Sequence, residues 1–170
     1  MFHIITAFIT TFATLSYYAM AIKAGVSQNE IKIHHDDKHF PYDTIVYREV
    51  YWARYVDWSM TTPLLLLDLC LLAGLSGANI LVAIVADIIM ILTGLFAAFT
   101  VEGGPKWGWY AMSCAAYLVV IYQLAINGRH VVSNKDKKTS TFFMAIAGFT
   151  LVLWTMYPMY VYHWRCHFIG

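Results

Sequence analysis

Five long apolar stretches constrain what this chain can fold into. They reach or approach the roughly 20 residues that a helix needs to cross a bilayer, and they lie at 2–22, about 47–73, 78–100, 106–127 and 142–162. The chain is 60% hydrophobic and only 12% charged, whereas soluble domains carry about 25% charged residues. Because a helix satisfies its own backbone hydrogen bonds in lipid, the sequence predicts an all-α membrane protein, an antiparallel bundle of about five transmembrane helices.

The connections between these stretches favour a single unit. The connection 23–46 is polar, 74–77 and 101–105 are short, and 127–140 is basic. We therefore predict one transmembrane helical domain over residues 1–170, in an integral, multi-pass membrane protein. The net charge of +1 gives no argument for a nucleic-acid partner.

The histidine-rich segment "HHDDKH" at 34–39 contains residue types that bind metals. A solvated polar loop explains it more simply, because no second cluster of ligands accompanies it. No metal site is predicted.

Four ionisable side chains fall inside the apolar stretches: Arg54, Asp57, Asp68 and Asp87. Such residues are costly in a membrane and suggest a functional site. Asp57 and Asp68 are eleven residues apart, which on a helix is about 20° past three full turns and roughly 16 Å along the axis. The two carboxyl groups are thus expected on one face, along the same interior path.

The surroundings of these acids predict different protonation states. Arg54 precedes Asp57 by three residues, a spacing at which helical side chains meet, so we expect it to stabilise ionised Asp57. Asp68 lies among leucines and is expected to stay protonated, because burial disfavours the charged form. An acceptor and a donor are what a proton relay needs. The alternative is that the acids are structural hydrogen-bonders, and for Asp87 a hydrogen bond across the bundle explains the residue as well as a chemical role does.

Aromatic residues lie within the apolar segments as well as at their ends. Interfacial belts explain aromatics at helix ends, but Trp58 and Trp154 fit a belt less well. Rings from separate helices, including Tyr110 and Tyr157, could wall a flat apolar ligand. Ordinary aromatic packing is the other explanation.

Several motifs together indicate a family. The segment "YWARYVDWSMTTPLLLLDL" (51–69) closely resembles the third helix of microbial rhodopsins, in the bacteriorhodopsin and fungal-opsin branch. The resemblance extends through "ADIIMILTGL" (86–95), "WYAMSCAAY" (109–117) and "LWTMYP" (153–158), and residues 5–25 are similar to the second helix of that family.

The resemblance implies a light-driven outward proton pump. In that family, seven helices enclose retinal, which is bound as a protonated Schiff base to a lysine on the last helix. By position, Asp57 would be the counterion and proton acceptor, Asp68 the cytoplasmic proton donor, and Arg54 the partner of the counterion. Carboxylates at both positions resemble the proton pumps, since halide pumps replace the acceptor and sensory members usually replace the donor.

The resemblance also implies a set of side chains that line or support the retinal pocket: Tyr55, Trp58, Thr61, Thr62, Asp87, Met90, Gly94, Tyr110, Ser113, Cys114, Tyr117, Trp154, Tyr157 and Pro158. Tyr110 stands where a tryptophan is common. The family further implies a cytoplasmic loop at 128–141, a non-enzymatic protein in the plasma membrane, membrane lipids and protons as partners, and a homo-oligomer, commonly a trimer.

The chain also departs from the family pattern. The first and last helices of the family have no counterpart in it, and with the last helix goes the Schiff-base lysine. The lysines present all fall in loops or at helix ends: Lys23, Lys32, Lys38, Lys106, Lys135, Lys137 and Lys138. We therefore expect a truncated or misread form of a longer opsin, inactive as a covalent pigment by itself.

Two other functions stay open at this stage. One is a non-photochemical, opsin-related membrane protein with a scaffold or stress role and no covalent retinal. The other is an intramembrane enzyme that uses the aspartates for acid–base chemistry, although only the acids themselves favour it.

Overall fold

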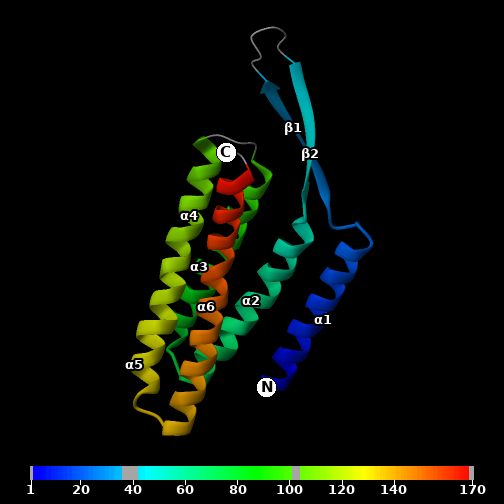
Figure 1. Ribbon diagram of the computed structural model, residues 1–170. Coiled ribbons are helices and arrows are strands. Elements are labelled where there is room, and N and C mark those ends of the chain that lie inside the picture. Colours follow the sequence, from blue (N-terminus) through cyan, green and yellow to red (C-terminus); the bar gives the residue numbers. More distant parts are fainter. Residues whose placement is uncertain (1, 36–41, 101–103, 169–170) are drawn as a thin grey trace.

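Long helices and one projecting β-hairpin make up the chain in a computed structural model, which describes residues 2–35, 42–100 and 104–168 (Figure 1). Within these residues, five helical segments are long and apolar enough to cross a membrane. The predicted helical-bundle fold is therefore confirmed. The helices are α1 (Phe2–Ala21), α2 (Trp52–Ala73), α3 (Gly77–Phe99), α4 (Gly104–Ile121), the π-helical η1 (Tyr122–Gly128), α5 (Arg129–Val132) and α6 (Lys137–Phe168).

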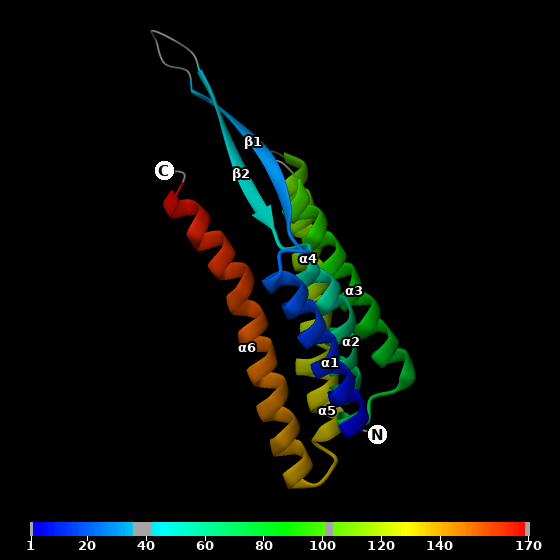
Figure 2. The same ribbon diagram turned by 90° about the vertical axis from the view of Figure 1, so that its right-hand side faces the viewer.

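The helices pack in chain order for most of the bundle. α1 packs on α2, α2 on α3 and α3 on α4, while η1 and α5 continue from α4 and α6 contacts α2 and α5 (Figures 1 and 2). The buried core lies toward the end of the bundle opposite the hairpin, where Leu66, Val120, Leu124 and Phe143 are fully buried. This arrangement places the middle of α2 between α1 and α3.

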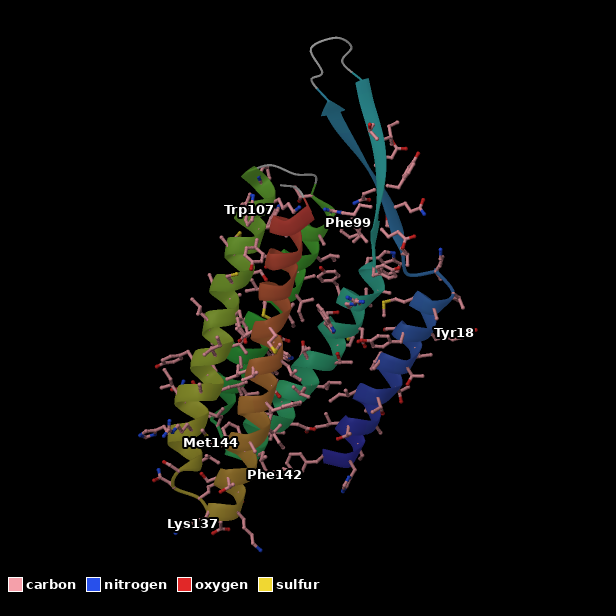
Figure 3. The ribbon with its side chains drawn as sticks, in the orientation of Figure 1. Tyr18, Phe99, Trp107, Lys137, Phe142 and Met144 are labelled. Atoms are coloured by element: carbon pink, nitrogen blue, oxygen red, sulfur yellow. The ribbon has the colours of Figure 1, made fainter. Side chains whose placement is uncertain are left out.

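Many large apolar side chains lie on the outer faces of the helices. Tyr18 on α1 and Phe142 on α6 are exposed, and Figure 3 shows both among the side chains drawn on their helices. In water such surfaces would favour association. In a bilayer they face lipid tails, in agreement with the apolar character of the sequence.

The β-hairpin was not predicted. Strands β1 (Ser27–His35) and β2 (Tyr42–Val50) pair antiparallel, with Ser27 opposite Val50. The sequence analysis described 23–46 only as a polar connection, and it was wrong in starting the second helix near residue 47, since α2 begins at Trp52. β-Branched and aromatic residues are frequent in β2, "YDTIVYREV", and these residue types favour strands.

Two side chains of the hairpin form hydrogen bonds with the C-terminal end of α3. Arg48 donates a hydrogen bond to the carbonyl oxygen of Ala98, and Asn29 Nδ2 donates to that of Phe99 over 3.5 Å. The last carbonyls of a helix have no partner within the helix. The hairpin therefore caps α3 while it connects α1 to α2.

The basic segment 127–140 is largely helical, contrary to the expected loop. The helix continues through η1 and α5 to Val132, and α6 already begins at Lys137. The short turn between them contacts α2, where Lys135 Nζ donates to the carbonyl of Leu72 over 3.3 Å. A lysine at the C-terminus of a helix satisfies an orphan carbonyl and complements the helix dipole.

Segment η1 widens the helix by one turn of π geometry. Within it, Asn127 Nδ2 donates to Oε1 of buried Gln123 over 2.8 Å. Gly128 ends the segment against α6, where an added Cβ would lie 2.7 Å from Cζ of Phe143. The close contact between η1 and α6 thus requires glycine at this position.

A second close approach joins the end of α1 to the start of α2. The amide of Ala53 donates to the carbonyl of Gly25 over 3.2 Å, and a Cβ at residue 25 would lie 2.3 Å from Cβ of Ala53. Gly25→Ala should lower the free energy of unfolding by about 1–3 kcal/mol, because one of the two backbones must shift. Thermal unfolding in detergent, followed by circular dichroism, measures this loss.

Gly77→Ala is the matched control, since an added Cβ there meets nothing within 4 Å. Equal effects of the two substitutions would contradict the close contact at Gly25.

Candidate functional site

Helix α2 carries two carboxyl groups at opposite ends of its span. Asp57 is 4% exposed and lies toward the hairpin, whereas Asp68 is half-buried and lies toward Gly74. A rise of 1.5 Å per residue separates them by roughly 16 Å along the helix axis. Buried Oδ1 atoms of both residues lack a hydrogen-bond partner within the part of the chain that the structure describes. Each carboxyl group therefore has an oxygen able to accept a proton or a ligand group.

The guanidinium carbon of Arg54 lies 5.9 Å from the ring centroid of Tyr51, nearer the membrane surface. The pairing of Arg54 with Asp57 that its spacing predicted stays a prediction. Long cationic side chains commonly extend toward the interface, where their charged end is better solvated. Arg54 thus lies between Asp57 and the surface end of α2 along the sequence.

Asp87 on α3 forms the cross-bundle hydrogen bond that was one of its two interpretations. Its side chain is fully buried, and Thr62 Oγ1 donates to Asp87 Oδ2 over 2.6 Å. Neighbouring Thr61 is also buried, but its hydroxyl donates to the carbonyl of Asp57 within α2, over 2.9 Å. Thr62 Oγ1 also lies 2.7 Å from the carbonyl oxygen of Trp58. Both threonines therefore bond within α2, and Thr62 in addition joins α2 to α3.

Part of the predicted pocket gathers where α2, α3 and α4 meet. A Cβ added at Gly94 would lie 3.7 Å from both Tyr55 Cε1 and Ser113 Oγ. Ser113 Oγ donates to the carbonyl of Met90 over 2.8 Å, and the rings of Tyr55 and Trp58 pack edge to face at 5.6 Å. These five residues come together from three helices, and their role in binding retinal stays a prediction.

Other predicted pocket residues lie between α4 and α6. Tyr117 donates to the carbonyl of Leu151 over 3.0 Å and also lies 2.8 Å from Thr155 Oγ1. Tyr117 and Trp154 both pack against the buried core. Thr155 was not predicted, although it stands inside the quoted "LWTMYP" motif and its hydroxyl was the available signal.

The structure says less about the other residues that were predicted to line the pocket. Tyr110 packs edge to face on Trp107 of its own helix, with ring centroids 6.1 Å apart, and Cys114 is a half-buried thiol. The side chains of Tyr157 and Pro158 lie outside the described residues. So does most of the histidine-rich segment 34–39, so the structure gives no test of it.

The lysines lie away from this pocket. Lys23 follows α1, Lys106 is in the first turn of α4, and Lys135 precedes α6. Lys32 is in the hairpin, and Lys137 and Lys138 open α6. Among the lysines that the structure describes, which exclude Lys38, none lies in the middle of a membrane-length helix.

Comparison with known proteins decides the family. Residues 1–163 match the family described as bacteriorhodopsin-like protein. The chain belongs to the bacteriorhodopsin-like family. Opsin-1 of Neurospora crassa is 51% identical over 164 residues, which cover 94% of this chain and 53% of that protein.

Solved structures of this family share the fold. The light-driven proton pump of Leptosphaeria maculans has 54% sequence identity and a TM-score of 0.87, with 93% of this chain and 65% of that chain covered. The chloride pump halorhodopsin has 31% identity and a TM-score of 0.78, with 91% and 62% covered. The chain spans about half the length of the curated relatives it matches. Since pumps for different ions share this fold, the side chains of the site must indicate the ion.

The Thr62–Asp87 hydrogen bond can be tested by removing its donor. Thr62→Val should lower the free energy of unfolding by about 1–3 kcal/mol, because a buried carboxyl group loses its partner. The carboxyl stretching band of Asp87 in the infrared spectrum should shift at the same time.

Thr93→Val is the matched control. Thr93 is buried whereas Thr62 is half-buried, and the printed bonds of the Thr93 hydroxyl stay within α3, to the carbonyl of Ile89 over 2.7 Å or to that of Met90 over 3.2 Å. If both substitutions lower the free energy of unfolding equally, the hydrogen bond between α2 and α3 adds no stability beyond that of a bond within one helix.

Proposed function

We propose that this chain forms the proton-transfer core of a retinal-binding, light-driven proton pump that moves protons outward across a membrane. The observation that carries the proposal is the placement of Asp57 and Asp68. Both lie on α2, each has a buried oxygen without a hydrogen-bond partner in the described residues, and about 16 Å separates them. Halorhodopsin shows that the fold alone does not select protons, whereas a carboxyl group at each end of one helix suits proton transfer.

The pocket residues suit retinal as the cofactor of the family. Aromatic rings of Tyr55 and Trp58 offer flat apolar walls, and Gly94 leaves space beside them. When bound, retinal supplies absorption of visible light and a light-driven change of shape. By its place in the family motif, Asp57 would balance a positive charge in the pocket and receive a proton, and its buried carboxyl oxygen has no hydrogen-bond partner in the described residues.

The direction of transport follows from the two ends of α2. Lys135 and the other basic residues of 129–138 lie at the Asp68 end, which is the cytoplasmic end in the topology that the family resemblance implies. The hairpin lies at the Asp57 end (Figure 1). Leu66, which is fully buried between the two acids, helps to exclude water from the direct path. Protons that enter past Asp68 and leave past Asp57 therefore move outward.

Residence in the plasma membrane and assembly into a homo-oligomer such as a trimer belong to the same proposal. Members of the family are light-driven pumps, and we assign no enzymatic reaction to this chain. The outer faces of its helices meet membrane lipids.

One observation favours a second candidate, an opsin-related membrane protein without covalent retinal and with a scaffold or stress role. The described lysines lie at helix ends, in turns or in the hairpin. A covalent link to retinal would thus need a lysine from outside the residues described.

The positions of the lysines lead to a test of whether this chain can bind retinal covalently. Membranes containing only the 170-residue chain should give no red-shifted band with all-trans retinal. Co-expression with the parts of the Leptosphaeria pump that have no counterpart in this chain should restore a band that hydroxylamine bleaches. A bleachable band from the chain alone would contradict the lysine argument, and no band in either case would favour the second candidate.

The two carboxyl groups should have separable effects in this co-expressed pigment. Asp57→Asn should abolish light-driven acidification of the medium, because the proton acceptor is lost. Asp68→Asn should slow proton uptake by about 100-fold, since a positioned acid contributes about that much to a proton transfer. A pH electrode and flash spectroscopy measure the two quantities.

Asp136→Asn provides the control, because Asp136 is an exposed residue in the turn before α6. Normal acidification in Asp57→Asn would refute the assignment of the acceptor, and normal uptake in Asp68→Asn would refute that of the donor.

A further inference from the structure

A short series of side chains leads from the surface at the hairpin end toward Asp57. Tyr51 stands between strand β2 and helix α2, and its hydroxyl donates to Glu49 Oε2 over 2.9 Å. The guanidinium carbon of Arg54 lies 5.9 Å from the centroid of the same tyrosine ring. Arg54 in turn precedes Asp57 by three residues. Glu49, Tyr51 and Arg54 thus form a contiguous group on the outward side of the proton acceptor.

Exposure increases steadily along this series. Asp57 is 4% exposed, Arg54 is half-buried, Tyr51 is 39% exposed, and Glu49 is exposed. A proton that leaves Asp57 toward the hairpin must cross this gradient to reach water. A carboxylate at its outer end, fixed by a hydrogen bond, is the natural group to receive that proton.

The contact between Glu49 and Tyr51 depends on the end of the hairpin. Side chains two residues apart do not meet on a helix, but β2 ends at Val50 and Tyr51 has φ −82° and ψ 75°, outside the helical region. The turn of the chain from strand to helix therefore brings the glutamate back over the start of α2. The same turn keeps the tyrosine ring beside Arg54.

We infer that Glu49, held in place by Tyr51, is the exit group through which protons released from Asp57 reach water on the hairpin side. This inference rests on the proposed pump function. It assigns a role to two residues outside the retinal pocket, at the junction of β2 and α2.

The proton balance of the step is simple. The O–H bond of protonated Asp57 breaks, and an O–H bond forms on the Glu49 carboxylate, which then passes the proton to water. Arg54 stays positively charged throughout. The hydrogen bond to Glu49 and the charge of Glu49 raise the pKa of Tyr51, so Tyr51 keeps its own proton at neutral pH and acts as a positioning residue.

The groups around Glu49 are compatible with this role. Gln28, which is uncharged, is its partner across the hairpin. Neighbouring Arg48 donates to the carbonyl of Ala98 on α3. The described hairpin holds another glutamate, Glu30, which accepts a 3.4 Å hydrogen bond from Tyr47 on the opposite strand.

Glu30 is the matched control because it forms the same kind of tyrosine–glutamate pair in the same hairpin. The printed contacts of this pair stay within the hairpin, whereas Tyr51 lies beside Arg54 of α2. Glu30→Gln therefore removes an equivalent charge without disturbing the series that leads to Asp57.

The first experiment uses the full 170-residue chain alone, in lipid vesicles without retinal. Tyrosinate absorbance is titrated for the chain and for Glu49→Gln, with Tyr51→Phe subtracted to isolate the signal of Tyr51. Glu49→Gln should lower the pKa of Tyr51, and Glu30→Gln should leave it unchanged. If Glu49→Gln leaves this titration unchanged, the paired exit group is overturned whatever the pigment does.

The second experiment times proton release from the co-expressed pigment with a soluble pH-indicator dye after a flash. Glu49→Gln should delay release by about tenfold or more, as expected when a positioned proton carrier is lost, with the uptake phase through Asp68 unchanged. Tyr51→Phe should delay the same phase to a smaller extent, because it keeps the ring beside Arg54 and removes only the hydroxyl. Glu30→Gln should release protons at the original rate.

The two proposals fail in distinguishable ways. Proton release that keeps its original timing in Glu49→Gln would overturn the exit group and leave the pump intact. A pigment that forms but releases no protons after a flash would overturn the pump and the exit group together.

Discussion

Polar groups inside an apolar layer must find their hydrogen-bond partners within the protein. In this bundle, the hydrogen bond between Thr62 and Asp87 is the most direct example of that constraint. It joins the middle of α2 to a fully buried carboxyl group on α3. An unsatisfied group there would be costly, so the bond sets how far α2 can slide or rotate against α3. The contacts of Gly94 with Tyr55 and Ser113 rely on that relative position.

The sequence predicted the helical part of the fold well because a membrane span has a simple signature. Length and apolar character placed five spans close to α1, α2, α3, the α4–α5 segment and α6. The hairpin was missed because a polar two-stranded ribbon buries little and leaves a weak pattern. The basic segment after η1 was predicted to be a loop because its charged residues were taken to end the helix. A helix can instead continue beyond the membrane, where its charged residues are in water.

The candidate site was predictable where chemistry and spacing on one helix were enough. The positions of Asp57 and Asp68, and the possibility that Asp87 bonds across the bundle, follow from the motif and the helical repeat. The predicted Arg54–Asp57 pair stays a prediction, because spacing says which side chains can meet and not which way a long cation extends. The sequence analysis did not identify Glu49 as a candidate site residue because it placed Glu49 inside a helix, where its side chain could not reach Tyr51.

The π-helical segment 122–128 has an implication for how such chains vary. A single turn of π geometry is what one inserted residue leaves behind when a helix absorbs it. The α-helical parts before and after it keep their own buried faces, with Val120 on one side and Val132 on the other. Relatives that differ by one residue in length at this point can therefore keep both halves of the span unaltered, so alignments of their sequences should allow a gap here, inside a transmembrane helix.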